Sequence, residues 1–258
     1  MEGYEKFKEQ IFRLTGLDLS LYKERQMKRR IESLIKRHQI DSYEDYFKVL
    51  KSDKAIFDEF INYLTINVSE FFRNPGQWDI LIQTVIPELM KGKRKLKVWS
   101  AACSTGEEPY TLVMALSRVI PLSEIKILAV DIDKEAINKA KSGVYSKKSI
   151  ENVPDDFKKK YFEPIGNSFK ISDDIKKCVE FKHFNLLKDK YPKDYDLIVC
   201  RNVMIYFTEE AKEEMYHNFN SALVENGVLF VGSTEQIILP QRYNFKALKT
   251  FFYQKETK

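Results

Sequence analysis

The chain has 258 residues, of which 43% are hydrophobic and 31% charged, so its composition is that of a globular protein with room for one large domain and a small one. No apolar run is long enough to span a membrane, and MEGYEKFKEQ lacks the pattern of a signal peptide. A net charge of +5 is too small to indicate nucleic-acid binding, and three cysteines and three histidines without paired spacing argue against a metal site. We expect a metal-free cytoplasmic protein and, with no dimer-forming apolar stripe, a monomer.

Residues 1–70 predict a small all-helical domain, because they contain amphipathic stretches and no run with the alternation of a strand. In the stretch YKERQMKRRIESLIKRHQI, apolar residues recur at helical spacing and would form one buried stripe. Three basic residues project from the opposite side of the same helix: Arg25, Arg29 and Lys36. This helix is therefore expected to have a buried face and a cationic face.

Residues 71–258 predict an α/β domain. Short apolar runs rich in β-branched residues alternate with helical stretches, which is typical of a mostly parallel sheet covered on both faces. The clearest runs are LKVWSA, EIKILAVD, CVEFKHF and YDLIVC. Two later runs, NGVLFVGS and FKALKTFFYQK, are close enough to form a terminal antiparallel pair. Residues 145–177 are polar and weakly periodic, which indicates a lobe inserted in the sheet domain.

The segment SAACSTGEEPY (100–110) follows the first of these strands and predicts a ligand-binding turn. Ligands of open α/β sheets bind beyond the carboxyl ends of the strands, and the small residues Ala102, Ser104 and Gly106 allow close approach to the backbone. A phosphate site favours bare amide groups and a lysine, whereas Glu107 and Glu108 would repel phosphate and attract a cation. A ligand with an ammonium and a sulfonium group, S-adenosylmethionine, suits such a turn.

The second strand, in ILAVDID, ends at Asp131, where a carboxylate can accept hydrogen bonds from both hydroxyls of a ribose. The alternative role for such an acid is to cap the next helix, but Asp133 is better placed because it directly precedes KEAINKA. The strand–turn–helix–strand–Asp pattern alone fits nicotinamide and adenosylmethionine cofactors equally. The two glutamates and the scarcity of glycine favour adenosylmethionine.

Several segments, in order along nearly the whole chain, resemble the chemotaxis receptor methyltransferase family, CheR. They are NVSEFFRNP (67–75), SAACSTGEEPY, VDIDKEAINKAKSGVY, FNLL (184–187) and CRNVMIYF (200–207). The resemblance implies a Rossmann-like class I methyltransferase domain behind an all-helical N-terminal domain, with residues 145–185 in the region where some members of the family carry an inserted β-subdomain. It also implies methyl transfer from S-adenosylmethionine to glutamate side chains on the cytoplasmic helices of methyl-accepting chemotaxis receptors. The products would be γ-methyl esters and S-adenosylhomocysteine.

The resemblance further implies roles for single residues. Arg73 would lie near the transferred methyl group and orient the substrate carboxylate through its guanidinium fork, while a salt bridge between domains is the alternative. Tyr206 would line the methyl-transfer channel, with a core position at the start of a helix as the alternative. The implied cofactor contacts are Asn67 and Ser69 at the methionine end, Arg73, Ala102, Glu107 or Glu108, Asp131 at the ribose, Asn185 and Leu186 at the adenine, and Arg201 and Asn202.

The implied reaction fits an absence in the sequence, which has no nucleophilic cysteine with a nearby histidine motif and no obvious general-base dyad. A glutamate carboxylate is already ionised at neutral pH and needs no base to attack a sulfonium methyl.

The basic residues Arg25, Arg29 and Lys36 would dock acidic receptor helices, or form only a solvated face. Two other functions stay open. An RNA methyltransferase would use the basic patch, although no RNA module is recognised, and a cofactor sensor would transfer no methyl group.

Overall fold

The computed structural model describes residues 2–65 and 69–256. By its internal contacts the chain divides into two compact units, Met1–Asn67 with Met204–Glu214, and Val68–Val203 with Met215–Lys258. Among the described residues, no helix combines the length and the apolar character needed to cross a lipid bilayer.

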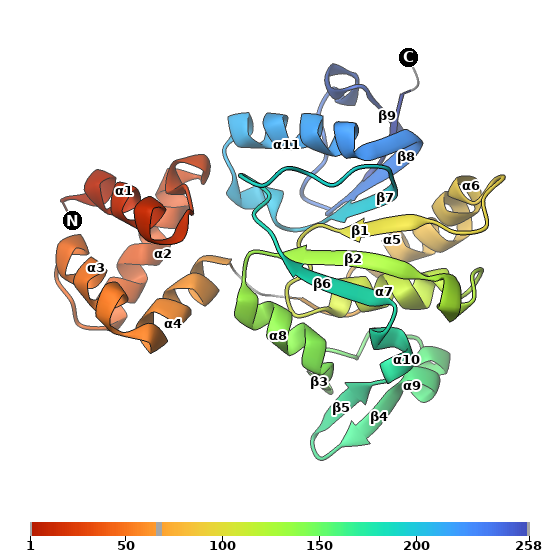
Figure 1. Cartoon of the computed structure of the whole chain (residues 1–258), viewed down its shortest axis with the longest axis horizontal. Coiled ribbons are helices and arrows are strands. Elements are labelled where there is room, and N and C mark those ends of the chain that lie inside the picture. The colour runs from red at the N-terminus through yellow and green to blue at the C-terminus, as the bar shows by residue number, and fades with distance from the viewer. Residues whose placement is uncertain (1, 66–68, 257–258) are drawn as a thin grey trace. The chain divides into compact units, whose positions relative to one another are not determined.

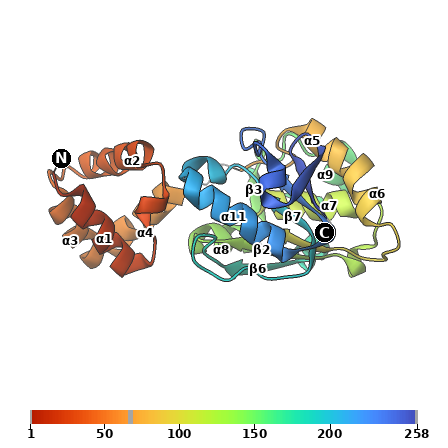
Figure 2. The same cartoon turned by 90° about the horizontal axis from the view of Figure 1, so that it is seen from above.

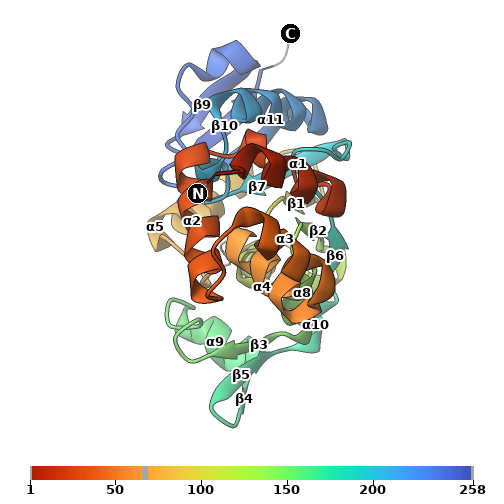
Figure 3. The ribbon, with the colours of Figure 1, turned by 90° about the vertical axis from the view of Figure 1, so that its left-hand side faces the viewer.

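The described part of the first unit is a group of α-helices (Figure 3). A cluster of buried aromatic side chains lies among them. The elements of this unit are α1 (Tyr4–Thr15), the 3-10 turn η1 (Leu19–Leu21), α2 (Glu24–Arg37), α3 (Tyr43–Ser52) and α4 (Lys54–Thr65). The Phe7 ring of α1 lies 5.2 Å from Tyr43 of α3 and 6.2 Å from Phe60 of α4, centroid to centroid. The apolar stripe predicted on α2 is buried, namely Met27, Ile31, Leu34 and Ile35. The all-helical character predicted for this part of the chain is confirmed.

The segment around Tyr206 belongs to this first unit although it lies far along the chain. It contains the 3-10 turn η4 (Met204–Tyr206). The Lys23 N–H donates to the Tyr206 carbonyl at 2.9 Å, and the rings of Tyr22 and Phe207 pack edge to face at 5.0 Å. The short loop between η1 and α2 therefore holds Tyr206 through its backbone.

The second unit is built on a seven-stranded sheet with the order β6-β2-β1-β7-β8-β10-β9 (Figure 1). Its strands are β1 (Lys97–Ser100), β2 (Lys126–Asp131), β6 (Val179–His183), β7 (Tyr195–Cys200), β8 (Leu223–Val231), β9 (Phe245–Lys249) and β10 (Phe252–Lys255). The first five strands in the sheet order are parallel, and β10 is antiparallel to both β8 and β9. The predicted mostly parallel sheet with antiparallel terminal strands is confirmed.

The C-terminal run FKALKTFFYQK differs in detail from the expectation, because it forms two strands instead of one. The chain reverses between β9 and β10, where Phe251 has a φ of 70°, and β10 then passes between β8 and β9. A residue in the left-handed region lets the chain turn back tightly, and Phe is an uncommon residue there, so the sequence carries no turn signal.

Alternate residues of each strand face opposite sides of the sheet. On β1, Val98 joins the core formed with α5, α6 and α7, whereas Trp99 packs against Phe219 of α11 with ring centroids 5.8 Å apart. The helices around the sheet are α5 (Pro75–Ile80), the π-helical turn η2 (Leu81–Val85), α6 (Ile86–Leu89), α7 (Glu107–Leu116), α8 (Lys134–Ser142) and α11 (Glu209–Ala222). The α5–α6 run lies beside α7 (Figure 2). Its π turn precedes Pro87, which cannot donate a helical hydrogen bond.

Between α8 and β6 the chain forms a small three-stranded antiparallel sheet with the order β3-β5-β4 (Figure 1). The remaining elements are β3 (Val144–Ser146), α9 (Asp155–Tyr161), β4 (Phe162–Ile165), β5 (Ser168–Ile171), α10 (Asp173–Lys176) and the 3-10 turns η3 (Leu122–Glu124) and η5 (Pro240–Tyr243). Ile171 and Ile175 are fully buried in the core of the large sheet. This small sheet is therefore packed onto the domain that carries it.

Candidate active site

The chain crosses from one half of the large sheet to the other at β1. It runs from β1 through β2 to β6 on one side, and then returns to β7 on the other side of β1. The carboxyl ends of β1 and β7 are level, because Ser100 pairs with Val199, and the Ala101 N–H donates to the Val199 carbonyl at 2.8 Å. Ligands of open α/β sheets bind beyond the strand ends at such a point of reversal.

The turn after β1 is closely packed at Gly106, where a side chain does not fit. Gly106, which precedes α7, has a φ of 96°, and a Cβ there would lie 2.8 Å from Ala140 Cβ and 2.9 Å from Tyr145 Oη. Ser104 also has a positive φ, of 45°, and Ala102 is half-buried. Packing inside the protein therefore excludes a side chain at position 106, whether or not a ligand also approaches the turn.

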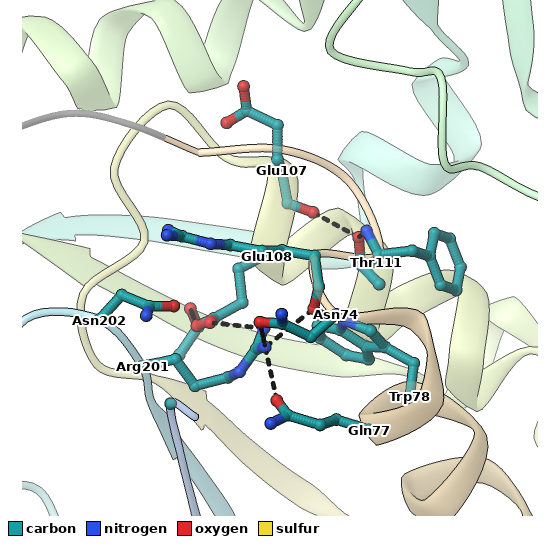
Figure 4. Close-up of polar contacts among 12 residues, drawn as sticks. Asn74, Gln77, Trp78, Glu107, Glu108, Thr111, Arg201 and Asn202 are labelled. Atoms are coloured by element: carbon teal, nitrogen blue, oxygen red, sulfur yellow. Dashed lines mark hydrogen bonds and ion pairs between the residues drawn. The ribbon is translucent and has the colours of Figure 1, made fainter. Parts of the chain in front are cut away.

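Glu107 and Glu108 lie in the first turn of α7, and their carboxylates point in opposite directions (Figure 4). The Glu107 carboxylate accepts a hydrogen bond from Thr105 Oγ1 at 2.6 Å and another from the Ser69 hydroxyl. It therefore connects the turn to the segment before Arg73. Glu107 and Ser69, both predicted as cofactor contacts, already contact each other.

The Glu108 carboxylate faces the ends of β1 and β7 instead. It accepts a hydrogen bond from Ser100 Oγ at 2.9 Å, and its second oxygen lies 4.0 Å from Arg201 Nη1. Burial raises the pKa of Glu108 to about 7, although the Arg201 charge and the Ser100 hydroxyl lower it. Burial also raises the pKa of Glu107. A nearby cation stabilises the ionised form of a buried carboxylate, so the site is suited to a cationic ligand.

Asp131 ends β2 with both carboxylate oxygens directed by the backbone. Its Oδ2 accepts the Ser104 N–H at 2.7 Å and its Oδ1 accepts the Asp133 N–H at 2.9 Å. A carboxylate has about four acceptor positions, so acceptor capacity remains for a ligand hydroxyl. Burial raises the pKa of Asp131 to about 6. The capping role falls to Asp133, as predicted, because its side chain accepts from the Glu135 and Ala136 N–H groups.

Arg73 lies in a turn between two residues in the left-handed region, with φ of 51° at Phe72 and 60° at Asn74. Such non-glycine conformations cost of order 1–3 kcal/mol each, so neighbouring groups must hold the turn. The Arg73 carbonyl accepts hydrogen bonds from Trp78 Nε1 at 3.0 Å and from Arg201 Nη2 at 2.8 Å. After burial, which is the largest cause, the Arg73 charge contributes to the pKa shifts of Glu108 and Arg201. The Arg73 guanidinium therefore belongs to the same site.

The corner after β7 is also held by a buried acid that sequence reasoning missed. Asn202 has a φ of 61°, and its N–H donates to Glu235 Oε2 at 2.5 Å. The same oxygen accepts the Gly232 N–H at 2.9 Å, and a Cβ on Gly232 would lie 2.5 Å from it. Glu235 follows the end of β8 just as Asp131 ends β2, and an acid after a strand is the signal that would have pointed to it.

The predicted adenine contacts follow the end of β6. Asn185 Oδ1 accepts the Leu187 N–H at 2.9 Å, and the Asn185 N–H donates to Asp189 Oδ2 at 2.8 Å. The Leu186 carbonyl accepts a hydrogen bond from the Tyr191 hydroxyl, and the Leu186 side chain is half-buried. This turn lies at the same sheet edge as Asp131, because β6 pairs with β2 in parallel and Asp131 pairs with His183.

The second unit thus brings most predicted cofactor contacts to one edge of the sheet. The exception is Asn67, which lies outside the described residues. Tyr206, predicted to line the methyl-transfer channel, belongs to the first unit. On α2 of that unit, the side chains predicted to dock the substrate are exposed, namely Arg25, Arg29 and Lys36. In residues 2–65 and 69–256, no group of three or more His, Cys, Asp or Glu side chains could hold a metal ion.

A sheet with a small-residue turn after β1, an acid ending β2 and buried carboxylates at the strand reversal is the architecture of an enzyme that binds an adenosine-containing cofactor. A family model described as "CheR methyltransferase, SAM binding domain" matches residues 67–252, and one described as "CheR methyltransferase, all-alpha domain" matches residues 2–65. The chain belongs to the CheR methyltransferase family. It is an S-adenosylmethionine-dependent methyltransferase, and the nicotinamide alternative is excluded.

Known proteins are similar to this chain over nearly its whole length. A protein of Listeria innocua serovar 6a named "Chemotaxis protein methyltransferase" is 44% identical over 255 residues, which cover 98% of this chain and 97% of that protein. A protein of the same name from Listeria monocytogenes has the same identity and coverage. One from Borreliella burgdorferi is 34% identical over 236 residues, or 86% of this chain and 83% of that protein.

Proposed function

We propose that the protein transfers methyl groups from S-adenosylmethionine to glutamate side chains of methyl-accepting chemotaxis receptors, forming γ-methyl esters for sensory adaptation. The observation that carries the proposal is the 44% identity, over 98% of the chain, with proteins named as chemotaxis protein methyltransferases. The partners would be the cytoplasmic helices of the receptors, and the enzyme would act as a monomer in the cytoplasm. The chemistry of the site supports this reading.

The chain's own residues fit the cofactor in charge and shape. Glu108 would bind the ammonium group, because its carboxylate faces the ends of β1 and β7 and is buried away from solvent. Asp131 would accept from the two ribose hydroxyls with its remaining lone pairs. The Asn185 oxygen is engaged within its own turn, so the Asn185 NH2 would donate to the adenine, with Leu186 as the apolar wall.

Arg201 and Asn202 would contact the amino-acid portion of the cofactor differently. The Arg201 side chain is engaged with the Arg73 turn, so Arg201 would contribute its backbone, while the Asn202 carboxamide would reach the ligand. Ala102 would allow close approach of the cofactor to the turn after β1. Asn67 and Ser69 would complete the methionine end, with Ser69 linked to it through Glu107.

The bound cofactor supplies an electrophilic methyl group on a sulfonium. A substrate glutamate is ionised near pH 7 and attacks without a general base. Arg73 would bind that carboxylate through its guanidinium fork and direct one oxygen at the methyl, and Tyr206 would line the channel. Alignment of nucleophile, methyl and leaving sulfur, together with exclusion of water, would then supply most of the acceleration.

The cationic face of α2 is proposed as the docking surface for acidic receptor helices. Arg25, Arg29 and Lys36 are exposed on the side of α2 opposite to its buried apolar stripe. Exposed charges of this kind chiefly raise the rate of association with an oppositely charged partner, and salt weakens their effect. The docking role therefore predicts a strong salt dependence of methylation.

The test is transfer of tritiated methyl from S-adenosylmethionine to receptor-containing membranes, followed by alkaline hydrolysis. Label on the receptor band that is released by base as methanol would support a carboxyl methyl ester. A parallel reaction with RNA tests the competing acceptor. Cofactor binding without label on the receptor would contradict the proposal, and label on RNA would replace it with an RNA methyltransferase.

A further inference from the structure

The Arg201 guanidinium lies inside the protein and is directed at the turn that carries Arg73. Its side chain is only 3% exposed. Its Nη2 donates to the Arg73 carbonyl at 2.8 Å, to Gln77 Oε1 at 2.8 Å and, more weakly, to Asn74 Oδ1 at 3.3 Å (Figure 4). All three acceptors lie within five consecutive residues, so one nitrogen of Arg201 binds the whole turn.

The other side of the same guanidinium faces the carboxylate of Glu108. Nη1 lies 4.0 Å from Glu108 Oε2, and the guanidinium carbon lies 5.3 Å from the centre of the Trp78 ring and 4.8 Å from that of Phe230. Both rings lie within cation–π range of the guanidinium and pack against it. Arg201 therefore spans the distance from Glu108 on α7 to the turn before α5.

The Arg73 turn needs such a partner because its backbone is strained. Phe72 and Asn74 both have positive φ, and the Phe72 N–H is bound by Thr111 Oγ1 at 3.2 Å. On the other side of Arg73, Trp78 Nε1 and Arg201 Nη2 share the Arg73 carbonyl. Loss of the Arg201 side chain would remove one of these two donors and leave the Trp78 indole N–H.

We propose that Arg201 is the positioning residue that holds the Arg73 turn: its side chain acts on the reaction through Arg73 and does not bind the cofactor. The inference rests on the role proposed above for Arg73. A guanidinium is required because it is planar and presents nitrogens on two sides, whereas the point charge of lysine cannot contact Glu108 and the turn together. Gln77 is the acceptor through which Arg201 fixes the first turn of α5.

The experiment compares three variants of the full-length protein: Gln77→Leu, Arg201→Lys and the double variant. Gln77 is buried and leucine has a similar size, so Gln77→Leu removes one acceptor of the Arg201 side chain and does not alter Glu107 or Glu108. We expect each single change to lower kcat for receptor methylation roughly tenfold, with the affinity for S-adenosylhomocysteine changed less than about twofold. The double variant should be no slower than Arg201→Lys, because both changes break the same contact between Arg201 and Gln77.

The matched control is Gln83→Leu, the same substitution at an exposed position in the same helical run, and it should behave as wild type. Amide hydrogen exchange provides a readout that does not depend on the substrate. Residues 72–78 should exchange at least about tenfold faster in Gln77→Leu and Arg201→Lys than in the control, while β1 and β7 keep their protection.

Unchanged exchange in residues 72–78, or effects on kcat that multiply in the double variant, would overturn the proposal. Weaker binding of S-adenosylhomocysteine with unchanged exchange would make Arg201 a cofactor ligand instead. If the wild-type protein methylates no receptor, the proposed function fails on its own, and the exchange of residues 72–78 still decides whether Arg201 holds the turn.

Discussion

Glu108 is a carboxyl group whose charge changes near neutral pH, because burial at the strand ends raises its pKa to about 7. Only its ionised form would attract the ammonium of the cofactor. Lowering the pH from 8 to 6 should therefore weaken binding of S-adenosylhomocysteine by up to about tenfold. Calorimetric titration across this range, compared with Glu108→Gln, separates this effect from titration of the ligand. An identical pH profile for both proteins would show that Glu108 does not bind the ammonium.

The same group should have the opposite effect on the stability of the ligand-free protein. Its folded-state pKa is raised above the ordinary value of 4.5, so the stability that it contributes is present below about pH 4.5 and is lost as the pH rises through about 7. The ligand-free wild type should lose stability relative to Glu108→Gln over this interval. Urea unfolding at pH 5 and pH 7.5 would measure the difference, and a wild-type unfolding free energy that does not fall relative to that of Glu108→Gln would contradict it.

Arg73 permits a graded test of carboxylate orientation. Arg73→Ala removes both charge and fork and should lower turnover at least about 100-fold with the fold intact, whereas Arg73→Lys keeps the charge and should retain an intermediate rate. The rates should be measured at saturating cofactor, because Arg73 is also a predicted cofactor contact. Wild-type turnover in Arg73→Ala would remove its role in catalysis.

At the scale of single residues, sequence reasoning identified groups that end strands or match the family's segments, and missed groups that act on them from elsewhere. Gln77 and Glu235 hold the Arg73 turn and the Asn202 corner, yet neither belongs to a segment with a recognisable pattern. Hydrogen bonds between residues 124 positions apart, such as Arg201 with Gln77, leave no local trace in a sequence.

At the scale of elements, α2 carries a prediction about association. Arg25→Glu/Arg29→Glu should lower the initial rate of receptor methylation at low salt several-fold, because the exposed charges would attract an acidic helix. The difference should shrink at high salt, since screening removes the attraction in the wild type as well. Receptor methylation measured at about 20 and 500 mM salt provides the test.

The control for this experiment is Lys51→Glu/Lys54→Glu, which makes the same change in charge at exposed positions on α3 and α4. An equal loss of rate in the control would mean that net charge, not the α2 face, drives association. Equal rates for the α2 variant and wild type at low salt would show that this face is a solvated surface with no role in docking.

Most helices and strands could be predicted from the sequence, because each parallel strand is a short apolar run and α2 has a clear helical stripe. The hairpin of β9 and β10 could not be predicted, since its reversal occurs at Phe251, a residue with no turn preference. The π turn at Leu81–Val85 also has no sequence signal apart from Pro87. Tertiary packing selects these local conformations against intrinsic preference.

At the scale of the whole molecule, the chain returns to its first unit after β7, and this yields a prediction for a fragment of residues 69–258. The fragment keeps the sheet, its core and the described cofactor contacts, so it should bind S-adenosylhomocysteine. Around Tyr206, however, it loses the backbone partner Lys23 and the ring of Tyr22, which packs on Phe207. Hydrogen exchange in residues 204–214 should therefore become faster while β1 and β7 stay protected.

Receptor methylation by this fragment should be lost, because both the basic face of α2 and the support of Tyr206 are removed. Unchanged exchange in residues 204–214 would show that this segment is ordered without the helical unit. A fragment that still methylates receptors at the wild-type rate would contradict the docking role of α2.

The sequence by itself determined the class of the fold and the family of the protein, because alternating strand and helix patterns and the segments around STGEEPY and RNVMIYF are local properties of the chain. Only the tertiary structure decided which groups meet. The reversal of strand order at β1 brings Glu108, Arg201 and the Arg73 turn together, and burial then raises the pKa of Glu108. Hydrogen bonding and desolvation depend on neighbours in space, and a linear pattern does not contain them.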